Sequence, residues 1–145
     1  MQLIVFLHVL AAIIWVGGSA FIAFALIPGL KGEDPATRSD LLRKTAGRFR
    51  VIGWAALLVA IGTGVYLAVT GGHMKSPWIH AKMGLVTLLL VASALHDWYI
   101  GPKLGALVRA GEDPGLYRKL AMILGQVSFV LALVIVYCGV RIVHP

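Results

Sequence analysis

The sequence predicts an all-α integral membrane protein, a four-helix up-down bundle, and three observations support this fold class. Of the 145 residues, 59% are hydrophobic and only 13% are charged, whereas about a quarter of the residues in a soluble domain are charged. The charges are confined to short stretches, which leaves long apolar runs at roughly 3–30, 49–70, 78–100 and 116–143. Each run reaches the ~20 residues that a helix needs to cross a bilayer. We therefore expect a single membrane domain, residues 1–145, in contact with lipid.

The first and third spans carry boundary signals. The first run begins at Leu3 with no basic segment before it and is too long for a signal peptide, so we expect it to remain as a span. The third helix is expected to start at Pro77, with Ser76 as its N-cap. Pro28 and Pro102 each stand beside a glycine near the far ends of these spans, and either helix can continue past its proline with a kink.

Small residues recur along the second and fourth spans, although no strong internal repeat is visible. Such residues let membrane helices approach closely, which favours a packing role over a cofactor role. The same faces could also join two copies of the chain as a homodimer. The residues concerned are Gly53, Gly62 and Gly64 in the second span, and Gly125, Ser128, Ala132 and Gly139 in the fourth.

Basic residues are unevenly distributed between the connections. A net charge of +7 would suggest nucleic-acid binding in a soluble protein, but here lysine and arginine lie mainly in 31–50 and 101–119. The positive-inside rule places those two connections in the cytoplasm. Both termini and the 71–77 connection should then face outward across a bacterial inner membrane, and nucleic acid is not an expected partner.

Residue type excludes several kinds of site. Cys138 is the only cysteine, so one chain can form neither a disulfide nor a Cys–Cys metal motif, and redox chemistry would require a cofactor. The six acidic residues all lie at or near the predicted cytoplasmic side, which excludes a carboxylate metal site at the opposite side. The sequence also lacks a phosphate-binding glycine loop and a nucleophile elbow.

Four of the five histidines fall at the predicted outer face. His8 lies about five residues inside the first span and His80 about two inside the third, so their depths differ by only ~5 Å. His73 and His144 lie in the outer loop and at the end of the fourth span. A histidine within a span is costly, which makes it a functional-site hypothesis. The first and third helices of an up-down bundle face each other diagonally, so His8 and His80 could ligate one metal from opposite sides, as a bis-histidine haem requires.

The surroundings of these two histidines are expected to accommodate a flat macrocycle, because the residues on the helix face of His8 follow 3–4 spacing and are mostly small, and the matching face around His80 is narrow too. Haem propionates would need cations at the outer surface, where Lys82, Arg141 and Lys75 are available. Lys82 points about 200° away from His80 on the helical wheel and can instead snorkel toward water. The two faces are His8, Ala11, Ala12, Trp15, Gly18, Ser19 and Ile22 in the first span, and His80, Gly84, Thr87, Val91 and Ala94 in the third.

Alternative interpretations of the histidines stay open. His8 and His80 can each bond a backbone carbonyl or a hydroxyl and only tighten the bundle. Copper is a second alternative, because imidazole and thioether groups suit that metal, although no dense methionine motif is present. The copper ligands would be drawn from His8, His73 and His80 together with Met1, Met74 or Met83.

His96 stands apart, at the predicted cytoplasmic end of the third span. It lies ~24 Å along the helix from His80, and no other span carries a histidine near it, so a second bis-histidine haem is not expected. His96 and Asp97 are a candidate proton-relay or ion-binding pair. We favour the structural alternative, an interfacial histidine anchored beside Trp98 and Tyr99.

The chain resembles two known membrane families over its four spans, and short motifs carry the resemblance. The segment FLHVLAAIIWVGG, residues 6–18, resembles the first-helix signature shared by CopD-like copper-resistance proteins and HemJ-type protoporphyrinogen oxidases. The segment PWIHAK, residues 77–82, resembles the Trp-x-His-x-Lys start of a HemJ-type helix. GRF at 47–49 leading into GTG at 62–64 is closer to the CopD-like pattern.

The resemblance to HemJ-type proteins implies a haem b ligand at His8 and functional roles for His80 and Lys82. The resemblance to CopD-like proteins instead implies copper handling at the inner membrane. We expect one haem b near the outer face, ligated by His8 and His80, with Trp15, Lys82 and Arg141 as further cofactor-binding residues. Its use would be electron transfer or a haem-dependent oxidation, with a quinone or another electron-transfer partner. Copper binding or transport across the inner membrane is the alternative function.

Overall fold

The computed structural model describes residues 1–143, which are helical almost throughout and contain no β-strand. Within this range, four helices are long and apolar enough to cross a membrane: Gln2–Gly29, Pro35–Thr70, Pro77–Ala110 and Gly115–Ile142. The predicted fold class, an all-α membrane protein with four spans, is confirmed. His144, expected at the outer face, lies outside the described residues.

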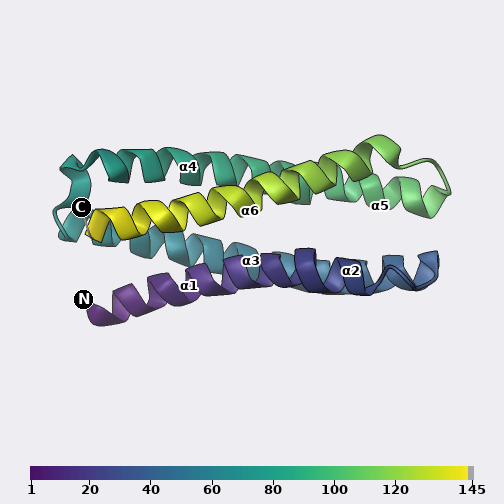
Figure 1. Ribbon diagram of the computed structural model, residues 1–145, viewed down its shortest axis with the longest axis horizontal. Helices are drawn as coiled ribbons and strands as arrows, with labels where there is room; N and C mark the ends of the chain where they lie inside the picture. Colours follow the sequence, from purple (N-terminus) through teal and green to yellow (C-terminus); the bar gives the residue numbers. More distant parts are fainter. Residues whose placement is uncertain (144–145) are drawn as a thin grey trace. The chain divides into compact units, whose positions relative to one another are not determined.

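The helices form two compact units, residues 1–74 and 75–145, and each is a hairpin of two antiparallel helices (Figure 1). We call the end of a hairpin at which its two helices are connected the joined end, and the opposite end the open end. The 3₁₀ turn η2 (His73–Lys75) lies in the connection between the units. Unit 1 contains α1 (Gln2–Phe21), the π-helical segment η1 (Ile22–Leu26), α2 (Ile27–Gly29) and α3 (Pro35–Thr70); unit 2 contains α4 (Pro77–Ala94), the π-helical segment η3 (Leu95–Ile100), α5 (Gly101–Ala110) and α6 (Gly115–Val143).

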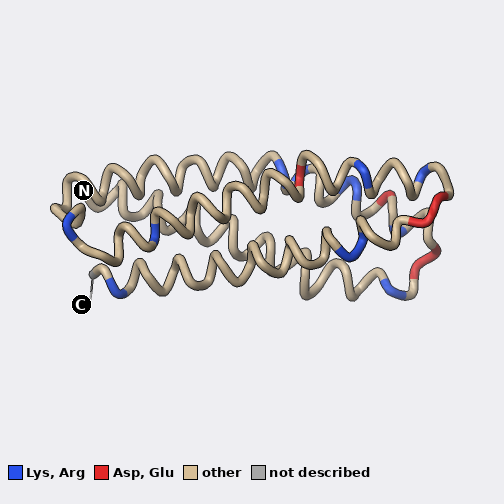
Figure 2. The backbone as a smooth tube through the Cα atoms, turned by 90° about the horizontal axis from the view of Figure 1, so that it is seen from above, with Lys and Arg blue, Asp and Glu red and all other residues tan. Residues whose placement is uncertain are grey.

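The second helix is longer than its apolar run. α3 begins at Pro35 rather than near residue 49, because the hydropathy of a segment marks only its lipid-facing part. The charged segment before residue 49 is helical, and Asp40 pairs with Arg43 at 2.6 Å and with Lys44 at 2.5 Å, one turn further on. Figure 2 shows the charged residues concentrated toward the joined end of each hairpin.

The third span also extends beyond its predicted end. α4 starts at Pro77 with Ser76 at the N-cap, as predicted, although no side-chain bond from the cap is present. The helix then continues past Pro102 to Ala110 and stops at Gly111, which has the left-handed φ of 69° that favours glycine. The predicted end near residue 100 is therefore too early, and the helix takes the alternative of continuing past its proline.

Unit 2 repeats the plan of unit 1, which corrects the expectation that the chain has no strong internal repeat. The tetrapeptide Gly-Glu-Asp-Pro occurs at 32–35, where its proline is the first residue of α3, and again at 111–114, directly before α6. A π-helical segment and a proline precede it in both units, and aligning Pro28 with Pro102 places η1 on residues 96–100 of η3. Sequence inspection missed the repeat because unit 2 has extra residues, in α5, between the proline and the tetrapeptide.

Helix contacts inside unit 1 depend on glycine. The phenyl ring of Phe49 occupies the space beside Gly18, where any Cβ would overlap it. Nearer the open end, a Cβ on Gly53 would lie 3.7 Å from the Trp15 indole. Glycine at these positions lets α1 and α3 approach closely, as in other membrane helix pairs.

The small residues of the second and fourth spans act mostly in packing inside the units. Ala132 of α6 and Leu89 of α4 are each only 3% exposed, in a unit whose two long helices contact each other along their length. By contrast, a Cβ on Gly62 or Gly125 would meet nothing within 4 Å. The predicted packing role therefore holds for most of these residues, and the homodimer stays a prediction.

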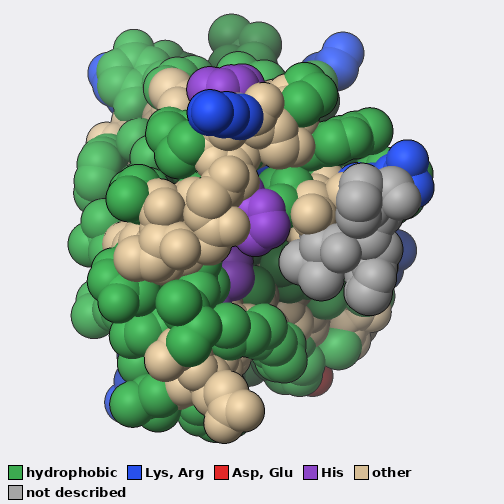
Figure 3. Space-filling model, turned by 90° about the vertical axis from the view of Figure 1, so that its left-hand side faces the viewer, with side chains coloured by type: hydrophobic (Ala, Val, Ile, Leu, Met, Phe, Trp, Pro, Cys, Tyr) green, Lys and Arg blue, Asp and Glu red, His purple; other side chains and the backbone are tan. Residues whose placement is uncertain are grey.

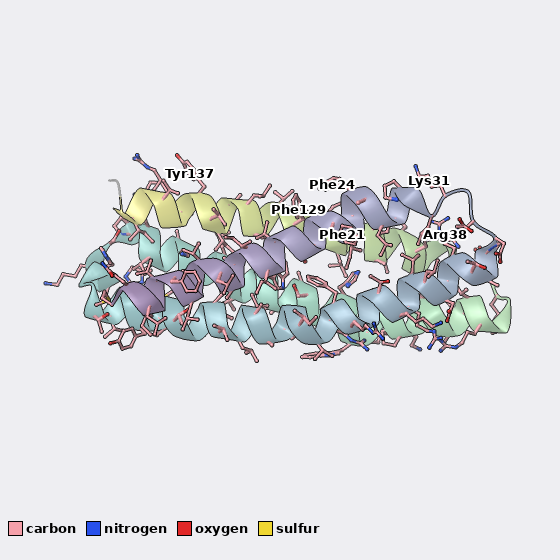
Figure 4. All side chains as sticks on the ribbon, turned by 90° about the horizontal axis from the view of Figure 1, so that it is seen from below. Phe21, Phe24, Lys31, Arg38, Phe129 and Tyr137 are labelled. Carbon is pink, nitrogen blue, oxygen red and sulfur yellow. The ribbon has the colours of Figure 1, made fainter. Side chains whose placement is uncertain are left out.

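Large apolar side chains cover the outside of the hairpins. Phe24 is 69% exposed and Tyr137 58% exposed, and Figure 4 shows how these side chains project from their helices. The buried residues are mostly small, such as Ala11 and Ala56. This distribution suits surroundings of lipid hydrocarbon, which solvates large aliphatic and aromatic groups and leaves small residues for helix contacts.

Candidate functional site

His8 is held by α3 inside unit 1. Its Nδ1 lies 2.9 Å from the backbone oxygen of Ala60 and 3.1 Å from the hydroxyl oxygen of Thr63. Thr63 donates its own hydroxyl proton to the carbonyl of Val59 at 2.6 Å, so both oxygens that face Nδ1 act as acceptors. Nδ1 therefore carries the proton, and Nε2 is the unprotonated nitrogen of the neutral ring.

Gly64 makes room for this ring. A Cβ at position 64 would lie 2.9 Å from Cε1 of His8, closer than real Cβ atoms come to a side chain. The orientation of the imidazole is thus set by a hydrogen bond on one edge and by the bare backbone of α3 on another. Metal-ligating histidines are commonly held by such an Nδ1–H bond to a carbonyl, and the same bond also satisfies a histidine that has only a structural role.

The small face of the first span packs against α3. Ala11 on this face is only 4% exposed, and Trp15 and Gly18 contact α3 as described above. Within unit 1 the face is therefore filled by the neighbouring helix rather than left for a macrocycle. An apolar groove of about 410 Å³ runs beside it, lined by aliphatic side chains between Leu7 and Ile14 of α1 and between Val51 and Val59 of α3.

The site residues of unit 2 lie at its open end. His80 is exposed on the first turn of α4, and no hydrogen bond joins its ring to another residue within 1–143. Lys82 is half-buried with its Nζ 3.1 Å from the position of a Cβ on Gly139, and no carboxylate of the described chain pairs with it. The Arg141 guanidinium lies over the Trp78 ring, 5.5 Å from its centroid, in a cation–π contact.

The remaining histidines have local roles. His73 lies in the connection between the units, where its ring folds back so closely that a Cβ on Gly71 would be 2.7 Å from its Cδ2. Figure 3 shows histidine side chains at the surface of the end of the molecule that carries this connection. His96 belongs to η3, and its Nδ1 lies 2.8 Å from Oδ1 of Asp97.

Among residues 1–143, no group of three or more His, Cys, Asp or Glu side chains is placed to hold a metal ion. A haem with two axial histidines does not need such a group, whereas the copper alternative would need thioethers to complete its ligand set.

Sequence reasoning missed the α3 partners of His8. Ala60 contacts His8 through its backbone carbonyl, which any residue type provides. Thr63 and Gly64 belong to a series of small residues that the sequence assigns to helix packing. The available signal was the Gly-Thr-Gly run at 62–64, because a threonine between glycines near the end of a span places a hydroxyl at a close helix contact. The antiparallel pairing of α1 with α3 was needed to bring it opposite His8.

Comparison with known proteins gives one relative to report. A protein of Aquifex aeolicus (strain VF5), named "Uncharacterized protein", is 35% identical to this chain over 145 residues, which cover 97% of this chain and 94% of that protein. No family model matches the chain, and no solved structure matches it significantly.

Proposed function

The chain belongs to the same family as this Aquifex aeolicus protein, and we propose that it binds haem b, with His8 and His80 as the residues that would hold the iron. The observation that carries the proposal is the hydrogen bond from His8 Nδ1 to the Ala60 carbonyl. It leaves Nε2, the nitrogen that ligates haem iron, unprotonated on a ring of defined orientation. When bound, haem b supplies one-electron redox chemistry.

Each side chain has a distinct part in this proposal. His8 and His80 would hold the iron, and Trp15, whose indole lies beside Gly53 of α3, would be a further cofactor-binding residue of α1. Lys82 and Arg141 provide positive charge at the open end of unit 2, where the propionates need cations. Lys82 is suited to this because no carboxylate of the described residues neutralises it.

The cellular setting follows from the charge distribution and from the resemblance to HemJ-type proteins. The open ends of the hairpins face outward from a bacterial inner membrane, with both termini outside. The function is electron transfer, or a haem-dependent oxidation as in an oxidoreductase, with a quinone or another redox protein as partner. Copper binding is the competing function.

The proposal is tested by an absorption spectrum of protein purified from haem-replete cells. We expect a Soret band and a b-type pyridine haemochrome, and we expect His8→Ala and His80→Ala each to abolish both. His73→Ala is the matched control, because it removes a nearby histidine from the connection, and its spectrum should be that of the wild type. Metal analysis on the same samples distinguishes haem iron from copper.

A colourless wild-type protein would overturn the haem proposal. If it contained copper that the same substitutions removed, the CopD-like alternative would replace it. If it contained neither, His8 would be a structural residue, and His8→Ala should cost stability by about 0.5–1.5 kcal/mol because the hydrogen bond from Nδ1 to the Ala60 carbonyl is lost.

A further inference from the structure

Two serine hydroxyls are buried in unit 2 without a protein partner. Ser93 on α4 and Ser128 on α6 are 8% and 7% exposed, and neither Oγ forms a hydrogen bond to another of the described residues. A buried hydroxyl that lacks a partner is unfavourable, and in a bilayer no bulk water is near to relieve it. These two groups therefore need an explanation beyond packing.

The antiparallel pairing of α4 with α6 places the two serines at similar levels when residues are counted from a contact near the open end. Near the open end, Lys82 of α4 lies against Gly139 of α6. Because the helices are antiparallel, counting the same number of residues along each from this contact leads to Ser93 on one and Ser128 on the other. Two hydroxyls at one level of a buried interface are suited to bind a bridging water molecule.

A titratable pair lies about one helical turn from Ser93, toward the joined end. The Nδ1 of His96 is 2.8 Å from Oδ1 of Asp97, and the two side chains are 36% and 24% exposed. Both residues belong to the π-helical segment η3, and such segments are frequent at functional sites. Histidine changes charge near physiological pH, and chains of aspartate and histidine carry protons in membrane proteins.

Other charged groups of unit 2 lie further toward the joined end. On the elements packed against η3, the nearest along the chain are Lys103 on α5 and Arg118 and Lys119 on α6. They are cations close to water at the joined end. The pair thus stands between a charged surface and the buried serines.

Unit 1 shows that the hairpin does not require these polar residues. The alignment of Pro28 with Pro102 matches Ser93 with Ser19, but it matches His96 and Asp97 with apolar residues. The alignment of the two Gly-Glu-Asp-Pro tetrapeptides matches Ser128 with an aromatic ring. The apolar equivalents are Ile22, Ala23 and Phe49. Because unit 1 has apolar residues at the positions of His96, Asp97 and Ser128 and keeps only a serine at that of Ser93, a function in unit 2 is the best explanation of the three polar residues.

We propose that the His96–Asp97 pair and the Ser93 and Ser128 hydroxyls form a proton-uptake path from the joined end of unit 2 into its span. A proton from water at the joined end is held by the imidazole–carboxylate pair. It then passes to water bonded to the serines, where each oxygen accepts one proton as it releases another to the next water toward the open end. The proton leaves there to bulk water, so the hydroxyls end unchanged and one proton has crossed the span. The path involves no haem, so the result of its test does not depend on whether the proposed haem function is correct.

The experiment uses the purified full-length chain reconstituted into vesicles that enclose a pH-sensitive dye. A potassium diffusion potential set with valinomycin drives proton entry, and its rate is compared with that of protein-free vesicles. We expect protein-dependent entry in the wild type, and its loss to the protein-free rate in Asp97→Asn and in the double variant Ser93→Ala/Ser128→Ala. Ser19→Ala, the equivalent serine of unit 1, is the matched control and should retain the wild-type rate.

Each possible rate of proton entry either supports the proposal or overturns it. A wild-type rate equal to that of protein-free vesicles overturns the proposal, and so does proton entry that survives in Asp97→Asn or in the serine double variant. Loss of entry in Ser19→Ala would also overturn it, because the effect would then not be specific to unit 2. His96→Gln provides a second variant of the pair if Asp97→Asn does not elute as a folded protein.

Discussion

At the scale of single residues, glycine decides where side chains can lie. Gly64 allows the His8 ring to rest on α3, and Gly18 allows the Phe49 ring to rest on α1. His8 satisfies its Nδ1–H with a backbone carbonyl, a group that in a helix already accepts one bond and still has a second lone pair. Each contact needs a large ring on one helix and a glycine, which has no side chain, on the other. Amino-acid composition does not tell which ring meets which glycine, so neither contact can be inferred from it.

The Gly18 contact leads to a stability prediction. Gly18→Ala should destabilise the protein by about 1–3 kcal/mol, because the added Cβ overlaps the Phe49 ring and forces it to move. Unfolding in a titration with denaturing detergent, followed by circular dichroism, measures the change.

Gly17→Ala is the control for this prediction, since a Cβ there meets nothing within 4 Å. It should be neutral or stabilising by up to about 1 kcal/mol, the gain in helix propensity of alanine over glycine. Equal losses in the two variants would show that Gly18 has no special packing role.

At the scale of elements, an aspartate carboxylate bonds backbone N–H groups at the start of the second helix in both hairpins. Asp34 accepts bonds from the N–H groups of Ala36 and Thr37 at 3.0 Å each, and Asp113 accepts one from Gly115 at 2.9 Å. The carboxylate satisfies helix-terminal N–H groups and complements the positive end of the helix dipole. This explains why α3 can begin in a charged segment well before its apolar run.

The cap on α3 leads to a prediction about pH. The Thr37 side chain, followed by the N–H groups of Thr37 and Ala36, lowers the pKa of Asp34 below its usual value of 3.8. A lowered folded-state pKa stabilises the fold above the unfolded pKa, and this contribution is lost as pH falls through the folded pKa. Asp34→Ala should therefore lower the melting temperature at neutral pH, and the difference from the wild type should shrink below about pH 4.

Glu33→Ala is the matched control for the cap, because it removes the adjacent carboxylate without removing the cap bonds. Its melting temperature should stay close to that of the wild type across the same pH range. A pH-independent difference between Asp34→Ala and the wild type would contradict the assignment of the cap.

At the scale of the whole molecule, two copies of one hairpin carry different polar groups. Aligning the prolines matches His8 of unit 1 with Lys82 of unit 2, and both lie against the second helix of their own unit. Toward the joined end, unit 2 has its serines and the His96–Asp97 pair where unit 1 is largely apolar. The repeated architecture thus supports one polar position near the open end of each unit and a second polar region in unit 2.

The distribution of lysine and arginine predicts the membrane orientation of the chain. Alkaline phosphatase fused after Gly72 should be active, since that connection is expected outside, and the same enzyme fused after Gly111 should be inactive. Green fluorescent protein at the same two positions should give the reverse pattern. Activity at Gly111 and fluorescence at Gly72 would invert the proposed topology.

The sequence by itself determined the helical class, the four spans and the charge asymmetry. These depend on apolar run length and on the cost of exposing backbone polar groups to lipid, both of which are local properties. It also indicated His8, because a histidine within an apolar run is costly whatever its neighbours are.

Only the tertiary structure decided what His8 touches and what the small residues are for. Whether the face around Trp15 receives a ligand or a helix depends on which span packs on it, and Ala60, Thr63 and Gly64 meet His8 through pairing between residues far apart in the chain. The repeat and the buried serines became visible for the same reason. The sequence shows which polar residues lie in apolar runs, where burial without a hydrogen bond is costly. The packing of the helices decides which hydrogen-bond partner such a residue meets.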